Sequence, residues 1–170
     1  MPVYYVITTA EASSNLARFD GVHYGYRSKD ISDLESTYIN SRTEGFGAEV
    51  KRRIMLGTFV LSAGYHDAYF TQAQKIRRLI REKTKEIFGS YDFIISPTTP
   101  HPPFKIGTKH KDPTKMYLED IFTVQANLSG NPAVSLPIGG NIDNFPLGIH
   151  IMADNFKESK LIAFAKSFYN

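Results

Sequence analysis

An apolar stripe between residues 65 and 89 constrains the fold of this chain more than any other feature of its sequence. Its members recur three, four or seven residues apart, at Tyr69, Ala73, Ile76, Ile80 and Ile87. This spacing places them on one face of a helix, and Gly89 is a suitable residue to end it. The Lys and Arg residues from 75 to 85 lie mostly off the stripe, with no aromatic residues among them. This pattern favours a solvated helix face over an RNA-binding one.

Three short apolar segments predict the strands of a sheet. The first, Phe93-Ile94-Ile95, is a continuous apolar run that ends at Ser96-Pro97 and indicates a buried strand. The other two, residues 133–138 and 147–152, are separated by the turn-rich residues 139–144. Helices that alternate with short strands indicate an α/β fold, in which a mixed β-sheet is flanked by helices.

Two further helices are expected in the second half of the chain. One spans about residues 114–128 and ends at Gly130-Asn131-Pro132. The other is an amphipathic helix that closes the chain and is opened by Asp154 or Asn155.

The first half of the chain carries weaker local signals. Residues 3–9 are β-branched and aromatic and favour a strand, whereas residues 10–17 favour a helix. Residues 20–43, rich in Gly, Ser, Asp and Tyr, are expected to form a loop. An apolar helical pattern then begins at Val50 and is expected to be broken near Gly57 and Gly64.

The size of the predicted sheet is small for the length of the chain. A chain of 170 residues corresponds to about one domain by the usual prior of roughly 100–200 residues. Only three strands are predicted within it. The small sheet therefore favours a fragment over a complete fold.

Composition and charge indicate a soluble protein of the cytoplasm. The net charge of +3 is too small to argue for nucleic-acid binding, and there are no cysteines. The longest mostly apolar stretch, residues 54–66, is shorter than the roughly 20 residues of a membrane helix. The N-terminus has no signal-peptide pattern, so neither a membrane nor secretion is expected.

The common catalytic and metal-binding motifs are missing from this sequence. Neither a Gly-x-Ser-x-Gly nor a Ser-x-x-Lys motif is present, and Gly45-Phe46-Gly47 is too short for a phosphate-binding loop. The histidines have no metal-ligand spacing, so no metal site is expected. They are His23, His66, His101, His110 and His150.

Three charged positions have both a structural and a functional interpretation. Arg52 and Arg53 precede an apolar run, where an arginine either pairs with Glu49 or faces a cavity and binds a carboxylate through two hydrogen bonds. Asp120 lies between apolar residues of the predicted helix. It either shares an exposed face with Glu119 or receives a cationic group, because a buried carboxylate needs a partner.

Six segments of the chain together resemble the amidase-signature family. They cover essentially the whole chain in the family's order, and two of them are similar to the A subunits of tRNA-dependent amidotransferases in particular: Asn15-Leu16-Ala17-Arg18-Phe19-Asp20-Gly21 and Glu49-Val50-Lys51-Arg52-Arg53-Ile54-Met55-Leu56-Gly57-Thr58. The other four are Tyr91-Asp92 with Ser96-Pro97-Thr98, Asp120-Ile121-Phe122-Thr123, Asn127-Leu128-Ser129-Gly130-Asn131-Pro132 and Pro146-Leu147-Gly148-Ile149-His150.

The resemblance implies that residues 1–170 are the C-terminal fragment of a single amidase domain. It also implies a glutaminase whose catalytic groups lie elsewhere. Family members cleave amides with a Ser–Ser–Lys triad, and nothing in this sequence matches the loop that bears it. No catalytic residue is therefore assigned here, and the isolated chain is expected to be inactive. A nucleophilic serine needs its base within hydrogen-bond reach.

The resemblance also implies three residues that bind glutamine. In the A subunits a Tyr, an Arg and an Asp hold the backbone atoms of glutamine, and the motifs place them at Tyr4, Arg53 and Asp120. Arg53 is preferred over Arg52, whereas Tyr4 and Tyr5 are nearly equivalent. His150 departs from the family, in which Gln is commoner at this position; this departure is interpreted as a neutral variation in a strand.

The resemblance further implies the reaction of the whole complex. Ammonia from glutamine would convert Glu-tRNA(Gln) or Asp-tRNA(Asn) to the amidated form, with ATP and Mg used by a partner subunit. Aminoacyl-tRNA would bind mainly through that partner, and subunits of the B and C types are the expected protein partners. The alternatives are a fragment of a general amidase and a stand-alone, non-catalytic interaction module; a ribosome-binding site just before Met1 would favour the module.

Overall fold

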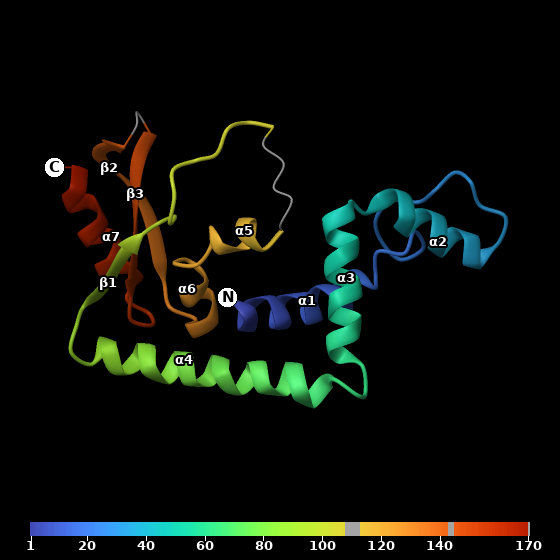
Figure 1. Ribbon diagram of the computed structural model, residues 1–170, viewed down its shortest axis with the longest axis horizontal. Helices are drawn as coiled ribbons and strands as arrows, with labels where there is room; N and C mark the ends of the chain where they lie inside the picture. Colours follow the sequence, from blue (N-terminus) through green and yellow to red (C-terminus); the bar gives the residue numbers. More distant parts are fainter. Residues whose placement is uncertain (108–112, 143–144, 170) are drawn as a thin grey trace. The chain divides into compact units, whose positions relative to one another are not determined.

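The computed structural model describes residues 1–107, 113–142 and 145–169. The chain divides into two compact units, Pro2–Gln74 and Lys75–Asn170, and Met1 belongs with the second (Figure 1). Tyr4 and Arg53 thus lie in the first unit and Asp120 in the second. The prediction that residues 1–170 form a part of one domain stays a prediction.

The first unit begins with α1, Pro2–Leu16, so the strand expected over residues 3–9 is wrong. The hydroxyl groups of Thr8 and Thr9 donate to the carbonyl oxygens of Tyr4 and Tyr5, four residues earlier, at 2.8 and 2.6 Å. These bonds satisfy the side chains within the helix. Ile7 and Thr9 are buried in α1, which packs against α3. Tertiary contact has therefore overridden the local strand preference.

Helix α2, Leu34–Gly45, occupies part of the segment expected to be loop, so that expectation is wrong for this stretch. A capping box begins the helix: Asp33 Oδ1 accepts a hydrogen bond from the Ser36 amide at 2.7 Å, and Ser36 Oγ accepts one from the Asp33 amide at 2.9 Å. The helix is mostly polar and has no apolar stripe, so hydrophobic periodicity could not reveal it.

Helix α3, Ala48–Leu61, runs through Gly57 without a break. The expected interruption there is wrong because Gly57 is buried where α3 crosses close to α1. The second expected break is confirmed, since α3 ends before Gly64. A single π-helical turn, η1 (Asp67–Thr71), then leads into the next helix.

The long amphipathic helix is confirmed as α4, Gln72–Phe88, and the amide of Gly89 bonds to the Lys85 carbonyl at 3.1 Å as the helix ends. Its charges pair along the solvated side, Arg78 with Glu82 and Lys83 with Glu86, each at 2.8 Å. Such i,i+4 and i,i+3 pairs are typical of an exposed helix face.

The second unit contains a three-stranded sheet in the order β1-β3-β2: β1 is Phe93–Pro97, β2 Ala133–Ile142 and β3 Phe145–Ala153. The α/β fold with flanking helices is confirmed, and both strand pairings in this part of the chain are antiparallel. Strand β1 lies at the edge, and its Ile95 is exposed rather than buried.

Helix α7, Glu158–Lys166, covers one face of this sheet. Ile151 and Ala153 of β3 are fully buried against Leu161 of the helix. The rings of Phe93 and Phe164 stack with centroids 4.3 Å apart. The helix begins later than the expected Asp154 or Asn155. A turn precedes it, in which the Lys157 amide bonds to the Asp154 carbonyl at 3.1 Å and Phe156 has a positive φ of 60°. A short 3₁₀ turn, Ser167–Tyr169, follows.

The helix expected over residues 114–128 is divided into α5, Pro113–Leu118, and α6, Val124–Ser129. The turn between them contains Asp120, so its expected place within a continuous helix is wrong. Gly130 ends α6 as expected, with a left-handed φ of 82° that favours glycine. The Asp143-Asn144 part of the predicted turn between β2 and β3 lies outside the described residues.

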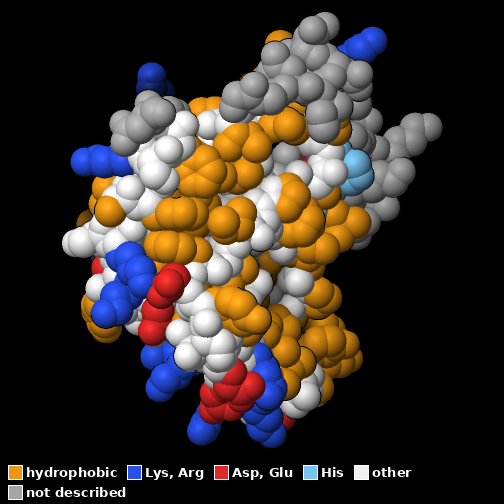
Figure 2. All heavy atoms as spheres, turned by 90° about the vertical axis from the view of Figure 1, so that its left-hand side faces the viewer, with side chains coloured by type: hydrophobic (Ala, Val, Ile, Leu, Met, Phe, Trp, Pro, Cys, Tyr) orange, Lys and Arg blue, Asp and Glu red, His pale blue; other side chains and the backbone are white. Residues whose placement is uncertain are grey.

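One face of the second unit is rich in apolar side chains (Figure 2). They spread over the face that carries α7 and the sheet, while charged side chains gather at its lower end, the level of α4 in Figure 1. Ile95 of β1 and Ile162 of α7 are both about half exposed. None of the helices in the described part of the chain combines the length and the hydrophobicity that a membrane span requires.

Candidate functional site

Two of the three predicted binding residues lie on helices that pack together in the first unit. Tyr4 is in the first turn of α1 and Arg53 in the second turn of α3. The Arg53 guanidinium carbon lies 5.6 Å from the centroid of the Tyr5 ring, and the Tyr5 ring meets that of Tyr4 edge-on at 5.5 Å. The structure therefore connects Arg53 with Tyr4 through Tyr5.

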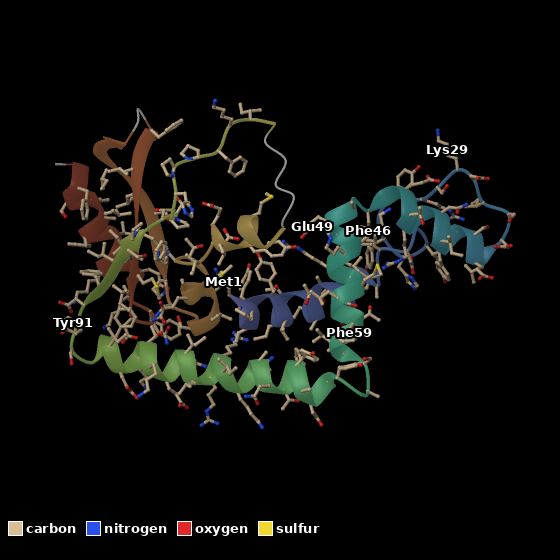
Figure 3. The ribbon with its side chains drawn as sticks, viewed as in Figure 1. Met1, Lys29, Phe46, Glu49, Phe59 and Tyr91 are labelled. Atoms are coloured by element: carbon tan, nitrogen blue, oxygen red, sulfur yellow. The ribbon has the colours of Figure 1, made fainter. Side chains whose placement is uncertain are left out.

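Glu49 lies in the first turn of α3 (Figure 3) and pairs with both candidate arginines. Its Oε1 accepts a hydrogen bond from Arg53 Nε at 3.0 Å, and its Oε2 accepts one from Arg52 Nη1. The ion-pair interpretation of this segment is thus observed, and one carboxylate serves two cations. The three side chains together carry one positive charge in excess, which is compatible with binding a further carboxylate.

The two arginines differ in their surroundings. The Arg53 side chain is 37% exposed and lies over Tyr5, whereas that of Arg52 is 56% exposed. Lys51, the third cation of the run, donates to the Thr43 carbonyl at 2.9 Å. Partial burial against an aromatic ring lowers the solvation of Arg53, which favours it over Arg52 as a binding residue.

Asp120 occupies an exposed turn of the second unit. Its carbonyl oxygen accepts hydrogen bonds from the Thr123 and Val124 amides, both at 3.1 Å, and so begins α6. Neighbouring Glu119 is 3.2 Å from His101 Nδ1. The exposed interpretation of Asp120 is the one observed, and its carboxylate is at the surface of this unit, where a cationic group can approach it.

A polar cavity of about 530 Å³ lies beside α6 and against the sheet. His150 lines it from β3, and its strand partners are Ser96 in β1 and Ser135 in β2. Burial lowers the pKa of His150, so its imidazole is neutral at pH 7. The lining residues are Thr123, Ala126, Asn127, Gly130, Asn131, Ala133, Val134, Ser135 and His150.

Little in the sequence indicates this cavity. No local sequence pattern assigns His150 a role, and only the pairing of three strands brings two serines beside it. The i,i+4 spacing of Glu49 and Arg53, by contrast, is a sequence signal that does predict their ion pair.

The Arg18-Phe19-Asp20-Gly21 motif has a structural role in the first unit. Asp20 Oδ1 accepts the amides of Val22 and His23, both at 2.8 Å, and Oδ2 lies 2.7 Å from His23 Nδ1. The hydrogen bond with the His23 side chain has the largest effect on the pKa of Asp20. Together with the two amide hydrogen bonds, it holds this pKa well below its usual range. The motif therefore fixes a turn.

In the part of the chain that the structure describes, no three His, Asp or Glu side chains form a group that could hold a metal ion. His110 lies outside that part. The described residues offer two charged groups for recognition. Arg53 of the first unit can bind a carboxylate, and Asp120 of the second unit can bind a cationic group.

Comparison with known proteins identifies the family of the chain. The Amidase family matches residues 1–162. The A subunit of the glutamyl-tRNA(Gln) amidotransferase of Chlorobaculum parvum is 57% identical over 164 residues, which are 96% of this chain and 34% of that protein. Its counterpart in Chlorobaculum tepidum is 56% identical over 163 residues, with the same shares covered. The chain thus spans about a third of the length of the curated relatives that it matches.

A solved structure shows the same relationship. The crystal structure of the glutamyl-tRNA(Gln) amidotransferase A subunit from Thermotoga maritima aligns with a TM-score of 0.55 and 44% identity over 75% of this chain and 29% of that one. Since the family match extends over nearly all of its residues, this chain belongs to the Amidase family, that of the amidase-signature enzymes.

Proposed function

We propose that this chain is part of the glutamine-hydrolysing subunit of a tRNA-dependent amidotransferase. In the proposed reaction, water cleaves the side-chain amide of glutamine to give glutamate and ammonia. The ammonia then converts Glu-tRNA(Gln) or Asp-tRNA(Asn) to Gln-tRNA(Gln) or Asn-tRNA(Asn). The observation that carries the proposal is the identity of 57% over 96% of the chain with a relative that bears the name of this amidotransferase component.

The charged residues support an amino acid as the substrate. Arg53 suits the α-carboxylate of glutamine and Asp120 suits its α-ammonium group, while Tyr4 lies beside the ring on which Arg53 rests. An aryl or fatty amide has neither charge and needs neither residue. These three assignments are predictions for the assembled site.

The remaining components belong to the complex as a whole. We expect ATP and Mg to bind the partner subunit, which also contacts most of the aminoacyl-tRNA, and we expect subunits of the B and C types as partners in the cytoplasm. The Ser–Ser–Lys triad is expected in the part of the protein that this sequence does not include.

Substrate preference in the full-length protein tests the proposal. Glutamine should be hydrolysed in preference to benzamide. Arg53→Ala and Asp120→Ala should each raise the KM for glutamine about ten- to hundredfold, because a charge-assisted hydrogen bond contributes about 1.5–3 kcal/mol. If benzamide is the better substrate, the chain belongs to a general amidase. An unchanged KM in both variants would refute the site assignment.

The chain alone provides a second test. Purified residues 1–170 should release no ammonia from glutamine, since a serine nucleophile requires a paired base and no triad motif is present. Ammonia release above the rate of a heat-denatured sample would contradict this expectation.

A further inference from the structure

We propose that Glu49 and Tyr5 are positioning residues for Arg53, which they hold in the orientation that receives the α-carboxylate of the substrate. This inference rests on the proposed function and names two residues through which its binding site is built. Neither residue needs to touch the substrate for this role.

The contact with Glu49 fixes the plane of the guanidinium group. Glu49 lies one helical turn before Arg53 on α3 and accepts a hydrogen bond from its Nε at 3.0 Å. A guanidinium group is rigid and planar, so holding Nε turns the edge formed by the two Nη atoms away from Glu49. That edge is one of those through which a guanidinium group can form two parallel hydrogen bonds with a carboxylate, and it does not include the Nε that Glu49 holds.

Tyr5 supports the same group from one face. The Arg53 guanidinium carbon is 5.6 Å from the Tyr5 ring centroid, within the range of a cation–π contact. The Tyr5 ring is itself held edge-to-face against Tyr4, with 88° between the ring planes. A hydrogen bond at Nε and an aromatic face together restrict both the rotation and the tilt of the guanidinium group.

Arg52 competes with Arg53 for the negative charge of Glu49. Glu49 accepts hydrogen bonds from both arginines, so its single negative charge is shared between two cations. An isolated Glu–Arg pair has no net charge to attract a carboxylate, whereas these three side chains together keep one positive charge. The shared carboxylate can therefore orient Arg53 while the attraction for the substrate is kept.

The test uses the full-length protein assembled with its partner subunits. Glu49→Ala should raise the KM for glutamine about tenfold and change kcat less than twofold, because it disturbs binding orientation rather than the reacting groups. Glu49→Gln, which keeps an acceptor oxygen without the charge, should give a smaller rise. Tyr5→Phe should retain more of the affinity than Tyr5→Leu does, since it keeps the ring.

Glu82→Gln is the matched control. Glu82 accepts a hydrogen bond from Arg78 at 2.8 Å in an i,i+4 pair on α4, so the change removes an equivalent helix ion pair elsewhere and should leave KM unaltered. In an Arg53→Ala background, Glu49→Ala should add less than a twofold further change, because residues that act through one another are not additive. Thermal unfolding of each variant separates a folding defect from a change in binding.

The outcomes distinguish this inference from the proposed function. If Arg53→Ala raises KM and Glu49→Ala does not, Arg53 binds without help from Glu49 and the inference is wrong. A lower KM in Glu49→Ala would overturn it too, since Glu49 would then compete with the substrate for Arg53. Absence of glutamine hydrolysis in the wild-type complex would refute the proposed function and the inference with it.

Discussion

Gly57 of α3 packs directly against the carbonyl oxygen of Thr9 in α1: a Cβ atom at Gly57 would lie 2.0 Å from that oxygen. The obstacle is backbone rather than a flexible side chain, so the helices themselves must move to accept it. We predict that Gly57→Ala lowers the free energy of unfolding of the full-length protein by about 1–3 kcal/mol, the usual cost of overpacking. Urea denaturation followed by circular dichroism measures this change.

Gly64→Ala serves as its comparison. No atom of the described residues lies within 4 Å of a Cβ at Gly64, and its φ is not in the left-handed region. The change should be neutral or stabilise the protein by about 0.4–1 kcal/mol through the unfolded chain. Equal losses in both variants would mean that helix separation is not the cause.

Ile151 and Ile95 offer a second matched pair, on adjacent strands. Ile151 is fully buried beneath α7, whereas Ile95, its partner across β1 and β3, is 52% exposed. Ile151→Ala should reduce the free energy of unfolding by about 2–5 kcal/mol, as expected for a buried Ile-to-Ala change that leaves a cavity. Ile95→Ala should reduce it by less than half as much in the same urea titration. A larger loss at Ile95 would show that this face of β1 is covered in the whole protein.

His150 should make stability depend on pH. Its pKa is lowered by burial in the folded protein and returns to its ordinary value of 6.5 on unfolding, so the unfolded chain binds more protons near that pH. We predict that the free energy of unfolding falls as pH decreases from 7.5 through 6.5, by no more than about 1.4 kcal/mol per pH unit for one group.

His150→Gln removes this titration and should flatten the profile between pH 7.5 and 5.5. Gln keeps hydrogen-bonding capacity towards the cavity without a charged form. An unchanged slope in His150→Gln would assign the pH dependence to other groups.

Sequence periodicity predicted the elements whose burial lies on one regular face. The stripe of α4 and the apolar runs of β1, β2 and β3 were each located correctly to within a few residues. The i,i+4 spacing of Glu49 and Arg53 also allowed their ion pair to be expected, and the structure contains it. Local patterns are informative where a segment's own side chains decide its conformation.

The wrong predictions for residues 3–9 and for α2 have causes that hydrophobic periodicity does not register. Residues 3–9 have strand-like side chains, yet they form a helix because α3 offers a surface that Gly57 allows α1 to approach closely. Helix α2 depends on a capping box and polar contacts rather than an apolar face, so periodicity could not detect it. In both segments, long-range or capping interactions outweigh propensity.

The sequence by itself determined the family, the α/β class and the three residues proposed to bind glutamine, because short motifs and apolar spacing are local properties of the chain. The tertiary structure alone decided which aromatic ring supports Arg53. The packing of α1 on α3 brings the Tyr5 ring beneath the guanidinium group, while Glu49 shares its charge between two arginines. The tertiary structure also decided that the buried His150 lies between Ser96 and Ser135 on neighbouring strands, since strand register sets which side chains meet across a sheet.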